Sequence, residues 1–289
     1  MVHSGVKYVP IDFIKAQVLN KKKHHFLSND LFGNVNHIYK NGALSKTILT
    51  YKNLKITIYE NNHRIELSGS LHTFYNNGKH NHNDFGYLAF LKALEWLKQD
   101  LDLEPSDLYL IQLEWGYNLK LPLNVGEFLD RCIQHRSVNK TVGIDCPKDG
   151  KYIQFKHSNY ILKVYDKGTQ FKLPEEVLRV EIKRTNWSEY RNLGITTFQD
   201  FIDYDKSIFL NELITQWERI LFFDLEVCEE NKFLKYSNQS FWTELRRTKS
   251  NKNFKYHFDK LKELNKNIGL NRRLDIVAEI IKKGNELQL

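Results

Sequence analysis

The pattern of apolar residues changes near residue 200, and this change constrains the fold more than any other feature. Before it, short segments alternate apolar and polar side chains, as in KITIYE at 55–60 and RIELS at 64–68, which flank a tight turn at Asn61–Asn62. Alternation is typical of strands that bury one face, and short turns favour antiparallel pairing. After it, apolar residues recur at helical spacing. We predict an α+β fold, in which an antiparallel β-sheet with helices packed on one face precedes a helical C-terminal region.

The same patterns place the remaining elements and a domain boundary. A stripe of leucines from Leu88 to Leu101, capped by Asn83 or Asp84, predicts a helix that stops in the turn-rich stretch Glu104–Asp107. The change of pattern divides the chain into residues 1–205 and 206–289. Further strands are predicted at Leu108–Trp115, Tyr152–Phe155, Tyr160–Lys167 and Val177–Lys183, and further helices at Val125–His135, Phe209–Phe223, Phe254–Leu264 and Arg272–Lys283.

The positive charge is concentrated near the C-terminal end. The net charge is +8, and the residues from Arg246 onward hold 12 Lys or Arg against 5 Asp or Glu. A local basic segment favours a polyanion such as nucleic acid, although a solvated helical face has the same composition. For Phe254, Tyr256 and Phe258 the alternatives are stacking on unpaired bases and the buried stripe of a helix. The predicted DNA-binding residues are Arg246, Arg247, Lys249, Lys252, Lys255, Arg272 and Arg273.

The sequence argues against several classes of protein. No apolar run approaches the ~18 residues of a transmembrane helix, and the first residues, MVHSGVKYVPIDF, have no apolar signal core. Cys132, Cys146 and Cys228 form no CxxC pair, which argues against a disulfide framework or a zinc ribbon. Walker A, GxGxxG, GxSxG and HExxH motifs are absent from the sequence. We expect a protein of the reducing cytoplasm that has no membrane partner.

The segment YILKVYDK at 160–167 carries a candidate nucleophile. Strand alternation places Tyr165 on the open face between Lys163 and Lys167, whereas Tyr160 has the opposite parity and is not expected to react. A phenol, with a pKa of about 10, is a poor nucleophile at neutral pH. The two lysines are expected to favour the phenolate and to attract a phosphate.

Three glutamates share a similar setting. Glu66, Glu114 and Glu181 each lie between apolar neighbours in a predicted strand, so all three are expected on the open face. Converging carboxylates would bind a hard divalent ion, Mg²⁺ or Mn²⁺, which polarises a phosphate. His72 continues the parity of Glu66 and is a further candidate ligand, whereas the H-x-H segment at 80–82 has the composition of a solvated loop. The alternative is an ordinary solvated strand face. The nuclease interpretation as a whole fails if Glu66 or Glu181 lies behind the sheet or far from the tyrosine, and a polymer-binding protein with a positively charged C-terminal region would then remain.

Three segments occur in the order SGSLHTFYNNGKHNHNDF at 68–85, LKVYDKGTQ at 162–170 and VLRVEIKRTN at 177–186. Together they resemble the phage and plasmid replication initiators of the filamentous-phage gene II/X type, which are rolling-circle nicking enzymes. The resemblance covers roughly residues 55–203 and does not extend to the C-terminal helices. It also departs from the family at Glu114, because the family often has an Asp after an Arg where this chain has Gln112-Leu113-Glu114.

The resemblance implies a role for each matched residue. Tyr165 matches the nucleophile of the family's Y-x-K strand, Glu181 matches the R-x-E glutamate, and Glu114 and Glu66 match the other acidic positions. The implied activity is metal-dependent, site-specific nicking and rejoining of DNA at the origin of a small phage or plasmid, through a 5′-phosphotyrosine. Residues 1–205 would carry this activity, whereas DNA binding by residues 206–289 is predicted from their basic charge and not from the resemblance. Host polymerase and helicase would be partners in the bacterial cytoplasm.

Two other interpretations stay open at this point. A mobilisation relaxase or a transposase-like strand transferase would use the same chemistry. A non-catalytic nucleic-acid-binding protein would bind DNA in a salt-dependent way, without cleaving it and without responding to chelators.

Overall fold

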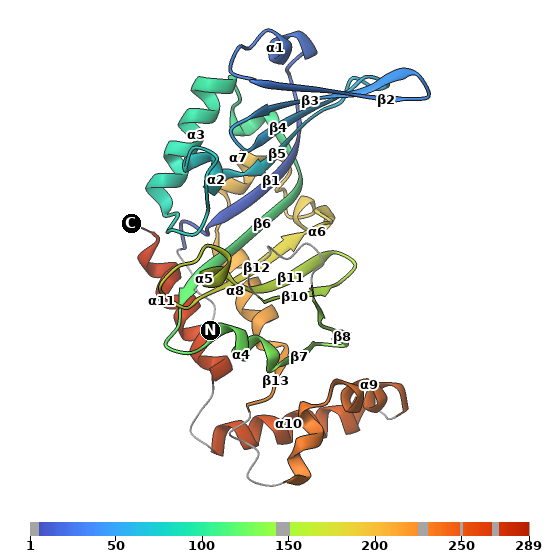
Figure 1. Ribbon diagram of the computed structural model, residues 1–289, viewed down its shortest axis with the longest axis vertical. Helices are drawn as coiled ribbons and strands as arrows, with labels where there is room; N and C mark the ends of the chain where they lie inside the picture. The colour runs from blue at the N-terminus through green and yellow to red at the C-terminus, as the bar shows by residue number, and fades with distance from the viewer. Residues whose placement is uncertain (1–5, 143–150, 225–230, 249–250, 268–271, 289) are drawn as a thin grey trace.

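The computed structural model describes residues 6–142, 151–224, 231–248, 251–267 and 272–288 (Figure 1). Within them, one antiparallel sheet of ten strands has the order β2-β3-β4-β5-β1-β6-β12-β11-β10-β9, and a smaller sheet has the order β13-β7-β8. The strands of the large sheet are β1 (Ile11–Val18), β2 (Asn34–Lys40), β3 (Ala43–Tyr51), β4 (Leu54–Tyr59), β5 (Ile65–Ser70), β6 (Leu108–Lys120), β9 (Thr141–Val142), β10 (Tyr152–Lys156), β11 (Tyr160–Asp166) and β12 (Val177–Arg184). Those of the small sheet are β7 (Cys132–His135), β8 (Val138–Asn139) and β13 (Ile220–Phe222).

Helices pack on one face of the large sheet, so the predicted α+β class is confirmed. No helix in the described ranges combines the length and hydropathy that crossing a membrane requires. The helices are α1 (Lys23–Leu27), α2 (Leu71–Tyr75), α3 (Tyr87–Leu101), α4 (Val125–Asp130), α5 (Lys167–Gln170), α6 (Ser188–Arg191), α7 (Phe198–Asp203), α8 (Ser207–Glu218), α9 (Gln239–Thr248), α10 (Asn251–Asn267) and α11 (Arg272–Glu286).

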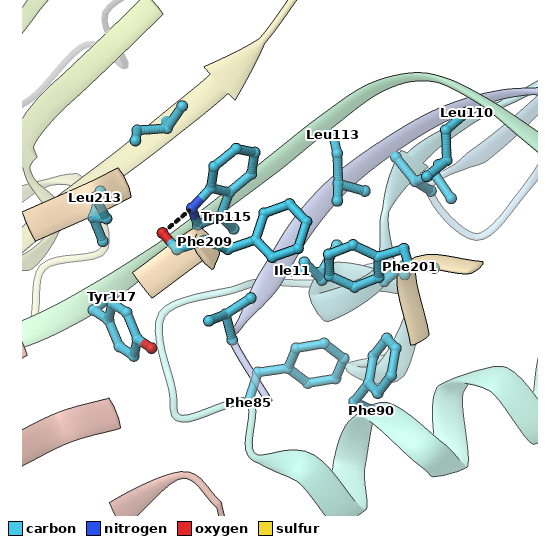
Figure 2. Packing of buried hydrophobic residues seen from close by; sticks show 14 of the residues in the cluster. Ile11, Phe85, Phe90, Leu110, Leu113, Trp115, Tyr117, Phe201, Phe209 and Leu213 are labelled. Carbon is cyan, nitrogen blue, oxygen red and sulfur yellow. Dashed lines mark hydrogen bonds between the residues drawn. The ribbon is translucent and has the colours of Figure 1, made fainter. Parts of the chain in front are cut away.

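The core lies between this helical layer and strand β6 (Figure 2). Phe90 of α3, Phe201 of α7 and Phe209 of α8 all belong to it and are fully buried. Trp115 on β6 packs edge-on against Phe209, with ring centroids 5.3 Å apart, and its indole N–H donates a hydrogen bond to the Phe209 carbonyl over 3.1 Å. Because these residues fill one face of β6, its polar residues are directed to the other face, where the candidate site lies.

The C-terminal helices divide between two clusters of buried side chains. Ile276 and Ile280 of α11 pack into the large core, and the Gln288 side chain accepts hydrogen bonds from the backbone N–H groups of Lys7 and Tyr8. A second, smaller cluster is formed by α9, α10 and the small sheet. The boundary at residues 205 and 206 stays a prediction, although α8 and α11 contribute to the larger cluster. The buried members of the second cluster are Ile133, Leu221, Phe223, Tyr236, Trp242, Leu245 and Leu261.

Two predicted helices are shorter than expected, because their last residues pair as strands. The segment predicted as a helix over Val125–His135 ends at Asp130 and continues as β7, and the one predicted over Phe209–Phe223 ends at Glu218 and continues as β13. β7 and β13 pair with each other, and this tertiary contact overrides the local periodicity.

The prediction that a stripe of leucines forms the buried face of α3 is only partly correct. Leu88 and Leu91 are exposed, and the buried face is formed by Phe90, Ala93, Leu97 and Leu101. The N-cap is Gly86 rather than Asn83 or Asp84.

Candidate active site on the open face of the sheet

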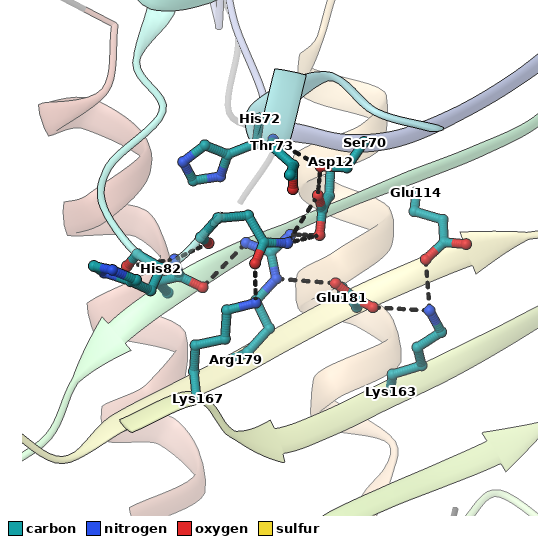
Figure 3. Close-up of polar contacts among 12 residues, drawn as sticks. Asp12, Ser70, His72, Thr73, His82, Glu114, Lys163, Lys167, Arg179 and Glu181 are labelled. Atoms are coloured by element: carbon teal, nitrogen blue, oxygen red, sulfur yellow. Dashed lines mark hydrogen bonds and ion pairs between the residues drawn. The ribbon is translucent and has the colours of Figure 1, made fainter. Parts of the chain in front are cut away.

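Four neighbouring strands, β1, β6, β12 and β11, bring the predicted nucleophile and its polar neighbours to one face of the sheet (Figure 3). Lys163 on β11 lies opposite Glu181 on β12, and Glu181 lies opposite Gly116 on β6. Glu114 on β6 lies opposite Lys183 on β12. The predicted shared face of Lys163, Glu114 and Glu181 therefore follows from strand parity and register together.

Charged side chains on this face form one continuous network. The Lys163 ammonium lies between two carboxylates, 2.5 Å from Glu114 and 2.9 Å from Glu181. The Arg179 guanidinium bridges Glu181 at 2.9 Å and Asp12 at 3.3 Å. This alternation of acids and cations compensates charges whose burial is otherwise costly. The linked residues are, in order, Lys167, Asn81, Asp12, Arg179, Glu181, Lys163, Glu114 and Lys183.

Gly116 lets β6 and β12 approach closely beside Glu181. A Cβ atom at this position would lie 2.1 Å from the Val180 carbonyl oxygen and 2.5 Å from the Glu181 Cβ atom, closer than real contacts allow. A residue without a side chain is therefore required opposite Glu181, and this fixes where the Glu181 carboxylate stands.

Tyr165 is buried beside this network and is not activated in the way predicted. Its hydroxyl lies 3.4 Å from Glu181 Oε2. Burial, and next the charge of Glu181, raise the pKa of Tyr165 well above its ordinary value. The expectation that the two lysines favour the phenolate is wrong, because Lys163 is held by carboxylates and the Lys167 ammonium lies over the ring face, 5.4 Å from its centroid.

The carboxylates of the network differ in acidity. Burial opposes the ionisation of Glu181, but Lys163 and Arg179 outweigh it and lower the pKa of that carboxyl. Burial likewise opposes the ionisation of Asp12, and Arg179 is the main cause of its lowered pKa. For Glu114 burial prevails over Lys163, so the pKa of Glu114 is raised. Glu181 is thus a persistent anion next to the Tyr165 hydroxyl.

Lys167 is a buried cation held by a loop. Burial, and next Arg179, lower the pKa of Lys167 to about 8. Its ammonium donates to the Asn81 side-chain oxygen over 2.6 Å, and the Asn81 amide N–H donates to Asp12 over 2.9 Å. Asn81 is the middle residue of the H-x-H segment at 80–82, whose two imidazole rings stack 4.1 Å apart outside any helix or strand.

Glu66 does not join this site, which corrects the prediction that three glutamates converge. Its carboxylate pairs with Lys15 at 3.2 Å and with Arg64 at 2.8 Å. Asp12, by contrast, accepts a hydrogen bond from Ser70 at the far end of the same strand. Ser70 lies four positions beyond Glu66 on this strand, ~13 Å away at the usual rise. The condition that Glu66 lies near the tyrosine is therefore not met, and the nicking proposed below relies on Glu181, Lys163 and Lys167 without Glu66.

His72 is also not placed to act as a metal ligand, because other side chains engage its ring. Its Nε2 atom lies 2.8 Å from the Asn83 side-chain oxygen, and its ring stacks on Phe85 with centroids 4.8 Å apart. Burial lowers the pKa of His72 to about 4, so the imidazole is neutral near pH 7.

The network does not fit the predicted divalent ion as it stands. Carboxylate oxygens are suitable ligands for Mg²⁺ or Mn²⁺. However, Glu114 and Glu181 already share the Lys163 ammonium, which an ion between them would have to displace. Across the described ranges, no group of three or more His, Cys, Asp or Glu side chains is arranged to hold a metal ion. The metal stays a prediction, and no step of the mechanism below depends on it.

The predicted DNA-binding residues of the C-terminal helices lie in different environments, and their role stays a prediction. Arg246 is half-buried, with its guanidinium 3.6 Å from the centre of the Phe254 ring. Arg272 lies 3.4 Å from the Asp224 carboxylate. Lys249 lies outside the described residues. Of the others, Arg247 pairs with Glu244, Lys255 pairs with Asp259, Lys252 is exposed, and Arg273 donates to the Glu218 carbonyl.

Four members of the network are absent from the predicted site residues: Asp12, Asn81, Arg179 and Lys183. Arg179 shares the parity of Glu181 in LRVEIK, so alternation alone could have found it. Asp12 lies in IDFIKAQV, whose alternation after Ile14 indicates a strand. Asn81 lies in a loop, and no sequence period indicates where its side chain is directed.

Comparisons with known proteins give little beyond this geometry. No protein-family model matches the chain, and no curated protein matches it. Among solved structures, the fold is similar to that of a rolling circle replication initiator protein from Geobacillus stearothermophilus, with a TM-score of 0.43 and 11% sequence identity over 87% of this chain and 95% of that chain. A similarity of this size does not assign a function.

Proposed function

We propose that this protein nicks and rejoins one strand of DNA through Tyr165 and thereby starts the rolling-circle replication of a small phage or plasmid genome. The observation that carries the proposal is the position of the Tyr165 hydroxyl. It lies 3.4 Å from an anion that can take its proton, Glu181, and both residues line a cavity of about 360 Å³ whose wall also includes Lys163 and Lys183. A cationic cavity beside a buried phenol suits a phosphodiester as substrate.

The chain's own residues account for the reaction as follows. Tyr165 Oη attacks the phosphorus atom and its proton passes to Glu181 Oε2, which lies 3.4 Å away. The bond from phosphorus to the 3′ oxygen breaks, and the Lys167 ammonium supplies the proton that turns the leaving oxygen into a 3′-hydroxyl. The product is a 5′-phosphotyrosine, and the reverse attack by a 3′-hydroxyl rejoins the strand. No nucleotide cofactor is needed, because the ester bond is kept.

Burial and the charge of Glu181 raise the pKa of Tyr165, so the phenol keeps its proton until Glu181 accepts it during the attack. Tyr152 on β10 offers a neighbouring ring, 5.5 Å from that of Tyr165, on which a base beside the scissile phosphate can stack.

The test is formation of a covalent protein–DNA adduct. The full chain is incubated with Mg²⁺, Mn²⁺ and a random pool of single-stranded oligonucleotides, and adducts that survive denaturation are isolated, sequenced and mapped by mass spectrometry. We expect adducts at Tyr165 on a restricted set of sequences, none with Tyr165→Phe, and wild-type amounts with the control Tyr160→Phe, whose hydroxyl is directed to Gln216 on the other face. An adduct formed by Tyr165→Phe would reject the nucleophile, and DNA binding without any adduct would favour a non-catalytic binding protein.

A further inference from the structure

A second cavity, of about 580 Å³, lies away from Tyr165, where α9 and α10 meet the small sheet and the end of α8. Its volume falls in the range of ~300–1,000 Å³ that is usual for sites that hold small molecules. Two features of its wall, an excess of cations and a pair of aromatic rings, indicate what it binds. Its lining residues include Arg136, Arg219, Arg246, Phe254, Phe258 and Lys262.

The cations of this cavity outnumber its acids. Glu218 is the carboxylate among the lining residues, against four cationic side chains. In the part of the chain that the structure describes, no salt bridge involves Arg136, Arg219, Arg246 or Lys262. The Arg246 Nε atom is buried without a hydrogen-bond partner. Cations that outnumber the acids in a hollow attract an anion, and arginine binds phosphate particularly well.

The rings supply a surface for a planar group. Phe254 and Phe258 are one turn apart on α10, and their rings are nearly parallel, with centroids 6.1 Å apart. Arg246 covers one ring, and the Lys262 ammonium lies 4.5 Å from the centre of the other. Aromatic rings next to cations are the arrangement with which proteins bind unpaired bases, because every base has a face that stacks and a phosphate that carries charge.

We propose that this cavity holds an unpaired nucleotide of single-stranded DNA, with its base against the wall formed by Phe258, Phe254 and the Arg246 guanidinium that covers Phe254, and its phosphates on Arg136 and Lys262. The proposal rests on the proposed function in taking DNA as the polymer. It would give the protein a second grip on the strand, separate from the nicking site. A duplex does not fit, because a paired base presents no free face to a hollow of this size.

The test measures binding without cleavage. Fluorescence anisotropy is recorded for labelled oligo-dT of about ten nucleotides with the full Tyr165→Phe chain in EDTA. We expect Phe254→Leu and Lys262→Gln each to weaken binding by about fivefold or more, the loss of roughly 1 kcal/mol that one stacked base or one phosphate contact contributes. The matched controls Tyr256→Leu and Lys260→Gln, on the same helix outside the cavity lining, should bind as the parent does.

A second measurement uses the unmodified chain, so that it does not depend on how a variant folds. Oligo-dT with 5-iodouracil is irradiated, and we expect crosslinks at Phe254 or Phe258. The proposal is rejected if no crosslink forms at Phe254 or Phe258, whatever forms at the nicking site, if an abasic or duplex oligonucleotide binds equally well, or if RNA binds better. Full competition by inorganic phosphate or by dTMP at the concentration of the oligonucleotide would also reject it, because the site would then take a free anion or nucleotide. These outcomes leave adduct formation at Tyr165 untouched, so the two proposals fail separately.

Discussion

The hydroxyl of Tyr165 lies 3.4 Å from the Oε2 atom of Glu181 on the neighbouring strand, and Arg179 Nε donates to the same oxygen over 2.9 Å. The arginine therefore orients the carboxylate toward the phenol and also keeps it ionised. A base that is oriented by a third group is the arrangement in which a side-chain hydroxyl becomes a nucleophile. The pair joins the reacting atom to the charged network behind it.

Replacement of Glu181 tests this relationship. Glu181→Gln keeps the shape of the side chain but cannot accept the proton, so we expect adduct formation to slow by about 10²–10⁴-fold, the usual contribution of a general base. We also expect the free energy of unfolding to fall by about 3–5 kcal/mol, because Lys163 and Arg179 lose a buried partner. Single-turnover rates and urea unfolding measure the two effects. Glu66→Gln, on the same face but paired elsewhere, is the control, and an unchanged rate in Glu181→Gln would contradict the assignment.

Replacement of Gly116 tests the position of the Glu181 carboxylate rather than its charge. In Gly116→Ala the new methyl group would overlap Val180 O and Glu181 Cβ, so β6 and β12 must separate and the carboxylate must move. We expect a loss of about 1–3 kcal/mol in the free energy of unfolding, as overpacking usually causes, and loss of adduct formation. Gly33→Ala, where a Cβ meets nothing within 4 Å, is the control. Wild-type adduct formation by Gly116→Ala would show that Glu181 need not be held so closely.

Strand parity predicts which face a residue occupies, and it succeeds where the alternation is unbroken. β11 and β12 pair over seven consecutive positions without a bulge. The sequence therefore places Lys163, Tyr165 and Glu181 on one face and Tyr160 on the other. Tyr160 is indeed directed to the helical layer, where its hydroxyl donates to Gln216 of α8 over 2.9 Å.

Parity does not predict where along that face a residue lies. For this reason the prediction that Glu66 joins Glu114 and Glu181 is wrong. The first strand of the chain, β1, inserts between β5 and β6 and so separates Glu66 from Glu114. Its register with β6 also shifts, between Ile11 and Ile14 and again between Lys15 and Ala16. Strand order and bulges arise from contacts between distant segments, which local periodicity does not record. The same insertion brings Asp12 into the network.

Lys163 allows the predicted metal to be tested directly. Its ammonium occupies the space between Glu114 and Glu181, so Lys163→Met would leave two carboxylates without their shared cation. We expect this variant to bind Mn²⁺ about tenfold or more tightly than the wild type by isothermal titration calorimetry, since tenfold corresponds to only ~1.4 kcal/mol. One competing charge at 4 Å is worth ~4 kcal/mol at an effective dielectric of 20. Lys15→Met, which frees only Glu66, is the control. Equal affinities would exclude a metal site between the two glutamates.

Lys167 predicts how stability depends on pH. Its pKa falls from 10.5 in the unfolded chain to about 8 in the folded protein, so between these values the unfolded chain binds more protons than the folded one. Stability contributed by this residue therefore rises with pH from about 8 to about 10.5, and below pH 8 its buried charge is fully destabilising. We expect Lys167→Met to be more stable than the wild type at pH 7, by as much as ~3 kcal/mol, and the difference to disappear toward pH 10.5.

Urea unfolding of both proteins across this range measures the difference. Lys206, whose pKa is also lowered to about 8 by burial, is present in both proteins, so its contribution cancels. A difference that stays constant with pH would show that Lys167 keeps its ordinary pKa. It would then have no readily released proton to give to the leaving 3′ oxygen, and the proton donor of the nicking step would have to be sought elsewhere in the network.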